Sequence, residues 1–184
     1  MDARTLQVRQ IFKGRVLQLN LEQVCLPNGV EATMEVIRHS GAAAVLPMLD
    51  HDRVLLIRQY RHAVGGFIWE VPAGRLDQGE DPAACAAREL EEEVGYRAGR
   101  LEKLGEILTT PGFCDERIHL FLATDLKPVP TNREHDEVME VEALRLSDAL
   151  GMVRSGAIAD AKTIVSLHAA LLADGPSDAR RGAP

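Results

Sequence analysis

The stretch from Gly74 to Tyr96, GRLDQGEDPAACAARELEEEVGY, constrains this chain more than any other. Asp81 can accept hydrogen bonds from the free backbone N–H groups at the start of a helix, and Pro82 is tolerated there because the first turn needs no intrahelical N–H. Alanines and a leucine continue the helix, and Gly95 is well placed to end it. The sequence therefore predicts a loop followed by one helix that ends at Gly95.

The end of this helix carries an unusual run of carboxylates. At about 100° per residue, Glu89, Glu92 and Glu93 lie on one face, while Glu91 points elsewhere. Like charges three and four residues apart repel each other, and the helix dipole disfavours anions near its C-terminus. A divalent cation such as Mg²⁺ or Mn²⁺, which prefers carboxylate and phosphate oxygens, would remove both penalties. Taken alone, the run is also compatible with an acidic face exposed to solvent.

The carboxylates belong to a longer pattern of fixed spacing. Gly74 is followed after five residues by Glu80, and after seven more by the motif R-E-L-x-E-E-x-G that starts at Arg88. This pattern resembles the Nudix box position for position. The one departure is Tyr96, where that family usually has an aliphatic residue, and this position is expected to pack rather than to react. The resemblance favours the metal site over the solvated face.

The composition limits the classes of function. A chain of 184 residues suits one ordinary domain with a small appendage. The formal net charge of −7 argues against a nucleic-acid-binding face, and it means that an anionic substrate needs a metal ion or a local basic pocket. Three cysteines far apart, Cys25, Cys85 and Cys114, indicate a reducing compartment without a disulfide framework or a zinc site. No signal peptide or membrane-spanning run is recognisable, so we expect a cytoplasmic protein without membrane contact.

Residues 1–40 are predicted to form a small β-meander. Val16–Leu19 and Glu22–Cys25 are short strand candidates. The Asn-Gly pair that begins at Asn28 is the strongest short-range hairpin signal, and it leads into a further strand, Glu31–Arg38. So small a sheet buries little surface by itself. It is therefore expected to lean on the next domain or on a second copy of the chain.

Residues 41–173 contain longer apolar strands and are predicted to form the main domain. Ala42–Leu49 and Val54–Tyr60 are interpreted as a buried hairpin, with His51 as a residue of the polar turn between them. The remaining predicted strands are Phe67–Val71, Leu104–Thr109, Ile118–Thr124 and Val138–Leu146.

Two helices and a tail are predicted at the end of the chain. Ser147 is expected to cap a short helix, and Asp160 a longer one that ends near Ala173. Residues 174–184 are small and polar, and they are expected to form a disordered tail.

The resemblance to Nudix proteins extends beyond the box, from about residue 36 to residue 172. The segments that resemble the ADP-ribose pyrophosphatase branch are Gln59–Arg61, Trp69–Gly74, Thr110–Phe113 and Asp160–Thr163. The resemblance implies an α+β fold, namely an α/β/α sandwich with a mixed sheet, preceded by a small N-terminal antiparallel sheet. Members of this branch typically pair through such a sheet, so residues 1–40 are expected to form the interface of a homodimer.

The resemblance also implies roles within the box. Glu89 and Glu93 are expected to ligate the metal ion, and the backbone carbonyl of Ala73 to complete the set. Glu92 is expected to be a further ligand or to act through a bridging water. Arg88 is expected to orient the carboxylates.

The box itself offers no obvious base for the attacking water. In this branch the base tends to come from a later loop followed by an alternating strand, which matches residues 136–141. We expect Glu137 to be the base, with Glu134 as second choice and Glu140, inside the strand, as third. A solvated acidic loop is the alternative interpretation of each of these residues.

Substrate contacts are expected outside the box. Arg61, at the end of a strand that faces the box, is the first candidate for a diphosphate contact, with a surface ion pair as the alternative. Arg38 and Glu70 are weaker candidates for substrate binding. Trp69 is either a core residue or a stacking partner for a nucleobase.

Pro111 bears on the identity of the substrate. It stands fifteen residues after Tyr96, and a proline at about this distance beyond the box is associated in the Nudix family with ADP-ribose hydrolysis. With Gly112 it would form a rigid turn beside the predicted helix that carries the acidic run. Such a turn can shape a pocket for the second ribose, although a Pro-Gly turn between two strands needs no function to explain it.

Together these features predict a magnesium-dependent hydrolase that converts ADP-ribose, or a related sugar nucleotide, to AMP and ribose 5-phosphate. The alternative is a Nudix enzyme for another nucleoside diphosphate derivative or for a damaged nucleoside triphosphate. A nucleotide-sensing Nudix module without catalysis is disfavoured, because none of the box glutamates is replaced.

Overall fold

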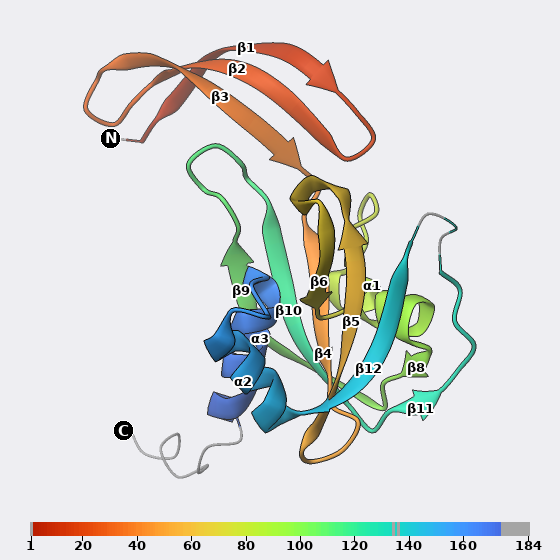
Figure 1. Ribbon diagram of the computed structural model, residues 1–184. Helices are drawn as coiled ribbons and strands as arrows, with labels where there is room; N and C mark the ends of the chain where they lie inside the picture. Colours follow the sequence, from red (N-terminus) through yellow and green to blue (C-terminus); the bar gives the residue numbers. More distant parts are fainter. Residues whose placement is uncertain (1, 134, 136, 174–184) are drawn as a thin grey trace, which may run out of the picture.

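The computed structural model describes residues 2–133, 135 and 137–173. The base candidate Glu134 and the predicted tail lie outside these residues. A small N-terminal sheet lies at one end of the molecule, next to a larger body of strands and helices (Figure 1). None of the described helices is long and apolar enough to cross a lipid bilayer.

The N-terminal sheet is antiparallel. In order, its strands are β1 (Arg4–Lys13), β2 (Leu17–Cys25) and β3 (Glu31–His39). The two short strands predicted within residues 16–25 are in fact one, because β2 pairs along its whole length with β3. The predicted Asn-Gly turn between β2 and β3 is confirmed. The N–H of Val30 donates to Oδ1 of Asn28 at 3.1 Å, and Gly29 has the positive φ of 82° that glycine tolerates.

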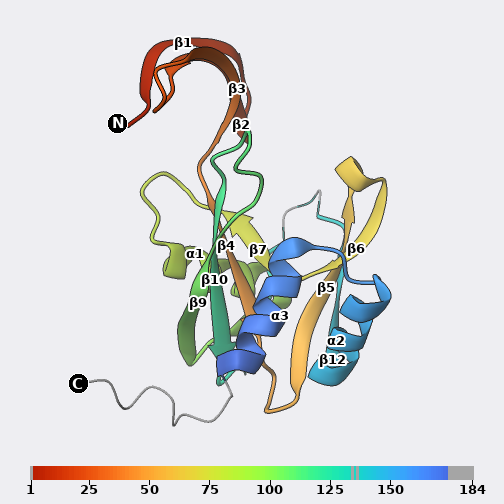
Figure 2. The ribbon, with the colours of Figure 1, turned by 90° about the vertical axis from the view of Figure 1, so that its left-hand side faces the viewer.

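This sheet curls and stands clear of the helices of the body (Figure 2). Every residue of β1 is exposed. The exposed positions include large apolar side chains, namely Leu6, Val8, Ile11 and Phe12, each about half exposed. An apolar strand of this kind is unusual on the surface of a protein that stays monomeric.

Two sheets form the centre of the body. The first contains, in order, β7 (Ala73–Arg75), β4 (Ala42–Pro47), β10 (Arg117–Thr124) and β9 (Arg100–Leu108). The second contains β12 (Met139–Arg145), β5 (Arg53–Arg61) and β6 (Gly66–Glu70). β4 and β10 run parallel while the other neighbours are antiparallel, so the first sheet is mixed. The remaining short elements are a 3₁₀ turn, η1 (His62–Val64), and the strand pair β8 (Tyr96–Arg97) and β11 (Lys127–Pro128).

The buried hairpin predicted for residues 42–60 is wrong beyond its turn. β4 and β5 are joined by a bridge between Met48 and Val54 and by a hydrogen bond from Leu49 N to Arg53 O of 2.8 Å. Each strand then pairs with other strands in a different sheet. Both strands are buried on both faces, and a continuous apolar run does not reveal which strands will be neighbours.

Helices cover the two sides of the strands (Figures 1 and 2). α1 (Pro82–Glu89) and the π-helical turn η2 (Leu90–Val94) lie on one side, and α2 (Leu146–Ser155) and α3 (Ala161–Ala173) on the other.

The two predicted caps of α2 and α3 have different outcomes. Ser147 was expected to cap α2, but this helix begins earlier, at Leu146, and Arg145 precedes it without a side-chain cap. The cap of α3 is confirmed, since Oδ2 of Asp160 accepts a hydrogen bond from the N–H of Thr163 at 3.0 Å.

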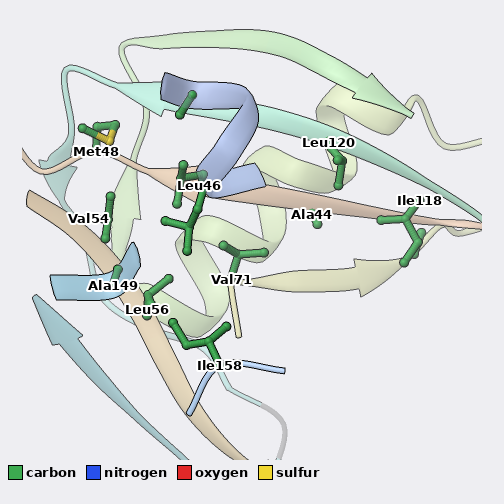
Figure 3. Close-up of a cluster of buried hydrophobic side chains, with 13 residues drawn as sticks. Ala44, Leu46, Met48, Val54, Leu56, Val71, Ile118, Leu120, Ala149 and Ile158 are labelled. Atoms are coloured by element: carbon green, nitrogen blue, oxygen red, sulfur yellow. The ribbon is translucent and has the colours of Figure 1, made fainter. Parts of the chain in front are cut away.

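Two clusters of buried side chains fill the space between these layers. Successive residues of β4 alternate between them, because Leu46 packs with side chains of α2 and α3, and Val45 with side chains of α1. Leu56 and Ile57 divide in the same way on β5. Figure 3 shows the first cluster, in which Val71 lies near Leu46 and Leu56. Each such burial contributes roughly 1.5–3 kcal/mol, so the strands that carry the site are firmly held.

Candidate active site

The acidic run lies where the predicted helix changes its geometry. Asp81 caps α1 as expected, because its Oδ2 accepts hydrogen bonds from the amides two and three residues later, at 3.0 and 3.2 Å. The α-helix ends at Glu89, and the wider turn η2 follows as far as Gly95, which has a φ of 78°. The prediction of one regular helix up to Gly95 is therefore wrong in its last turn. Turns of this π-helical kind are frequent at functional sites.

Glu89 lies against the loop that precedes the helix. The residue is buried, and a Cβ atom on Gly74 would overlap its carboxylate. Gly74 is therefore required for the close approach of Glu89. Burial raises the pKa of Glu89, the Arg88 guanidinium opposes this, and the charges of Glu92 and Glu137 add to the rise.

Glu93 is only 2% exposed. Its Oε2 accepts a hydrogen bond from the N–H of Ala73 at 3.1 Å. Burial, together with the charges of Glu89 and Glu137, raises the pKa of Glu93 to about 8. A cation beside Glu93 would stabilise its ionised form and lower this pKa.

Arg88 ties the remaining carboxylates together. Its Nε and Nη2 contact the two oxygens of Glu80 at 3.0 and 3.1 Å, and its Nη1 contacts Glu89 at 2.6 Å and Glu92 at 3.1 Å. Glu80 also accepts a hydrogen bond from the N–H of Asp77 at 2.9 Å, which holds the loop. This is the geometry that an orienting role for Arg88 requires.

The box residues line a pocket of about 510 Å³, which we call the first pocket. Its lining residues are Arg15, Val16, His39, Arg61, Ala73, Gly74, Arg75, Asp77, Arg88, Glu89, Glu92, Asn132 and Glu137. Four arginines thus share the pocket with four carboxylates. The pocket combines oxygens that suit a hard cation with guanidinium groups that suit phosphate.

Several residues that line the first pocket could not be predicted from any motif in the sequence. Arg15 and Val16 lie in the β1–β2 turn, and Arg75 donates a hydrogen bond to the backbone carbonyl of Arg15. His39 is the last residue of β3. Their position depends on how the N-terminal sheet packs on the body, which no local motif reports.

A second pocket, of about 480 Å³, adjoins the first. The residues common to both pockets are His39, Arg61, Ala73, Gly74 and Arg75. The second pocket is otherwise lined by Ala42 of β4 and by residues of β9, of β10, of the turn between them and of the start of α3, with Thr110 and Lys162 among them. Arg61 therefore lies at the border of the two pockets, where a diphosphate that spans them would pass.

Arg61 is held in place by Glu70. Nε and Nη2 of Arg61 contact the two oxygens of Glu70 at 2.8 and 2.9 Å, and Nζ of Lys162 reaches the same carboxylate at 2.5 Å. Burial acts to raise the pKa of Glu70, but the hydrogen bonds to Arg61 and Lys162 outweigh it and lower the pKa below its usual value. Glu70 is only 1% exposed and lines neither pocket among the described residues. The structure therefore places this predicted substrate contact behind Arg61.

Other predicted residues also lie outside the pockets. Arg38 is engaged by Glu22 at 2.7 Å and by Asp115 at 3.0 Å, which ties β3 to the β9–β10 turn. Trp69 packs against the first core cluster, which favours the core interpretation. Pro111 is exposed in the β9–β10 turn, next to a residue of the second pocket.

The acidic side chains are divided between the pocket and the surface. Glu137 lines the first pocket, whereas Glu140 points to solvent, 3.7 Å from Arg58. Glu91 points away from the other box glutamates, as predicted, and pairs with Arg97 at 2.7 Å.

A separate group with ligand atoms within 4.8 Å of one another consists of Asp50, His51 and Asp52. It lies in the β4–β5 turn, at the opposite end of β4 from the first pocket. The carboxylate of Asp50 accepts hydrogen bonds from the backbone of Asp52 and Arg53 and from the Arg53 side chain. These bonds are those of a tight turn, which fits the interpretation of His51 as a turn residue.

The oxygens that line the first pocket, together with the buried carboxylate of Glu93 beside Ala73, suit a divalent cation. Buried Glu93 and Glu89 have raised pKa values that a cation would lower, and Gly74 leaves room for the carboxylate of Glu89. Glu92 and the carbonyl of Ala73 add hard oxygen donors of the kind that Mg²⁺ and Mn²⁺ prefer.

Comparison with known proteins agrees with this arrangement. The NUDIX domain matches residues 38–167. The chain belongs to the Nudix family. This Nudix chain is 42% identical over 170 residues to the ADP-ribose pyrophosphatase of Bacillus subtilis (strain 168), covering 91% of the chain and 92% of that protein. It is 39% identical over 169 residues to the methanol dehydrogenase activator of Bacillus methanolicus, covering 91% of both. Nudix hydrolases of this type use a divalent metal ion.

A solved structure confirms the Nudix fold. The crystal structure of an ADP compounds hydrolase superposes with a TM-score of 0.82, covers 94% of both chains and is 22% identical in sequence. The predicted α+β class, with its mixed sheet and small N-terminal sheet, is therefore confirmed.

Proposed function

We propose that this Nudix chain hydrolyses the diphosphate of ADP-ribose, or of a closely related sugar nucleotide, to AMP and ribose 5-phosphate. The observation that carries the proposal is the first pocket, where Glu89, Glu92 and Glu137 share a space of about 510 Å³ with Arg61. Carboxylates suited to a metal ion beside a cation suited to phosphate are what a diphosphate hydrolase needs. The similarity to the ADP-ribose pyrophosphatase of Bacillus subtilis supports the choice of substrate.

Mg²⁺ is the proposed cofactor. Glu89, Glu92, Glu93 and the carbonyl of Ala73 would hold it. When bound, it neutralises charge on phosphate oxygens and lowers the pKa of water.

The chain's own side chains then have distinct tasks. Arg61 binds the diphosphate and orients it, since its guanidinium lies at the border of both pockets. Glu137 accepts the proton of the attacking water as general base. The new bond forms between the water oxygen and the adenosine-side phosphorus. The bond from that phosphorus to the bridging oxygen breaks, and ribose 5-phosphate leaves with the bridging oxygen.

The reaction is tested with ADP-ribose, Mg²⁺ and ¹⁸O-labelled water. AMP and ribose 5-phosphate are expected, with the label in AMP. Label in ribose 5-phosphate would refute the direction of attack. A higher kcat/KM for a nucleoside triphosphate than for ADP-ribose would refute the proposed substrate.

We propose further that two copies pair through residues 1–40, and that the protein is cytoplasmic. The exposed apolar side chains of β1 support pairing, because so small a sheet gains stability by covering them. The wide spacing of Cys25, Cys85 and Cys114 in the sequence supports a reducing compartment.

A further inference from the structure

Asp160, Ala161 and Lys162, at the start of α3, border the second pocket. Oγ1 of Thr163 donates to Oδ2 of Asp160 at 2.6 Å and accepts from the N–H of Val71 at 2.8 Å. The first turn of α3 is therefore bound to the chain two residues before Ala73, whose carbonyl belongs to the proposed metal site.

Lys162 extends this connection to Arg61. Its Nζ lies 2.5 Å from Glu70 and 3.0 Å from Asp160, and its side chain is only 11% exposed. Glu70 holds Arg61 at the same time through two further hydrogen bonds. One buried carboxylate is thus shared by two cations that come from different elements, β5 and α3.

The net charge of the cluster formed by Arg61, Glu70, Asp160 and Lys162 affects how strongly the site attracts an anion. Arg61 and Lys162 balance Glu70 and Asp160, so the cluster as a whole is neutral. Without the charge of Lys162 the cluster would carry a net negative charge directly beside the path of a diphosphate. Because the cluster lies in a partly buried, low-dielectric region, that negative charge would offset much of the attraction that Arg61 exerts on the substrate.

We propose that Lys162 is a positioning residue of the diphosphate site, which acts by sharing Glu70 with Arg61. It fixes the guanidinium at the border of the two pockets, where Arg61 presents its charge to the substrate. The proposal rests on the proposed function in that the substrate is a diphosphate. It does not depend on which sugar the diphosphate carries.

The test uses Lys162→Met, Lys162→Gln and Lys162→Arg in the full chain, with Lys127→Met on the exposed strand β11 as a matched control. Binding of inorganic pyrophosphate in the presence of Mg²⁺ is measured by calorimetry, and KM and kcat are measured with ADP-ribose. For K162M and K162Q we expect Kd and KM to rise roughly tenfold, a change typical of losing an interaction with a charged group. kcat should stay within about twofold, K162R should restore most of the affinity, and K127M should match wild type.

A double-mutant cycle with Arg61→Ala separates positioning from a general effect on the fold. If Lys162 acts through Arg61, K162M should change pyrophosphate affinity far less in the R61A background than in wild type. An equal change in both backgrounds, or a lower kcat with unchanged KM, would overturn the proposal. So would loss of folding by both K162M and K162Q in circular dichroism.

The two proposals fail in different ways. If the wild-type chain leaves ADP-ribose intact, the proposed function is wrong, and pyrophosphate binding still decides the role of Lys162. If ADP-ribose is cleaved but K162M and K162Q bind pyrophosphate like wild type, the role of Lys162 alone is wrong.

Discussion

Glu89 and Glu93 have environments that make their charge costly without a cation, and this makes them direct tests of the metal site. Glu89→Gln and Glu93→Gln change little volume but remove a charged ligand. Each should lower kcat by more than about 100-fold, beyond the usual cost of losing an outer-shell partner of a metal ligand. kcat at saturating Mg²⁺ and calorimetric Mg²⁺ binding measure the effect, and circular dichroism checks the fold. Most of the wild-type activity in either variant would contradict the assignment.

Glu137 and Glu140 form a natural pair of variants, since they are neighbours in sequence but only Glu137 lines the first pocket. Glu137→Gln should lower kcat by about 10²–10⁴-fold, the usual contribution of a general base. KM should change much less, because the loss lies in the transition state. Glu140→Gln should be close to wild type. An active E137Q together with an inactive Glu134→Gln would transfer the role of base to Glu134.

The pKa of Glu70 predicts how stability depends on pH. It is lowered from the usual 4.5 in the folded chain, so the ionised form stabilises folding above that pH. This contribution is lost as the pH falls through the lower pKa of the folded state. Glu70→Gln should therefore be less stable than wild type at pH 7, by roughly 1–3 kcal/mol, since the charge facing two cations is gone.

The difference between wild type and E70Q should shrink as the pH falls below about 4.5, the usual pKa of a glutamate. Urea unfolding at several pH values measures it. Glu35→Gln, at an exposed position of β3, should show no such dependence. A constant difference from pH 3 to pH 7 would show that the charge of Glu70 is not the cause.

At the residue scale, motif spacing was a good guide to the groups that gather in the first pocket. Arg61, Ala73, Arg88, Glu89 and Glu92 all line it. Glu70 was misplaced because strand position alone does not show that a carboxylate is buried behind an arginine.

At the scale of elements, strand β7 and helix α1 pack closely because Gly74 has no side chain. Gly74→Ala would place a Cβ atom where the carboxylate of Glu89 lies. We expect Mg²⁺ affinity and kcat to fall by about 10–100-fold, the range seen when a ligand loses its support. The thermal midpoint should fall by only a few degrees, about 1 kcal/mol.

Gly151→Ala in α2 is the control for Gly74→Ala, because the added methyl group would lie 3.7 Å from Arg154, an ordinary van der Waals contact, whereas at Gly74 it would overlap the Glu89 carboxylate. This variant should keep full activity. If G74A also kept full activity, the packing of Gly74 on Glu89 would not be a requirement of the site.

The ends of a helix or strand could be predicted where a single capping residue determines them. They could not be predicted where contacts with distant parts of the chain determine them. Asp81 caps α1 and Asp160 caps α3 through side-chain hydrogen bonds, and both caps are predictable from the sequence. The π-helical turn after Glu89 carries Glu93, which is buried against Ala73 of strand β7, and helical periodicity does not report that contact. β4 and β5 lie in different sheets because β4 pairs with β10 and β5 with β12. Pairing between strands so distant in the chain is not visible in a local sequence pattern.

For the molecule as a whole, the exposed apolar strand β1 leads to a prediction about assembly. Val8→Glu combined with Phe12→Glu should convert a dimer into a monomer, because charge on an interface strand is costly to bury. Sedimentation velocity over a range of concentrations measures the change. The single-chain fold should survive, since both side chains are exposed within one copy. A wild-type chain that sediments as a fully active monomer at all concentrations would contradict pairing.

The ion pairs of Arg88 also concern the chain before a metal ion is bound. This one guanidinium pairs with Glu80, Glu89 and Glu92, so two carboxylates of the acidic run have a counter-charge within the chain itself. Synthesis of the chain and loading with its ion can therefore be separate events.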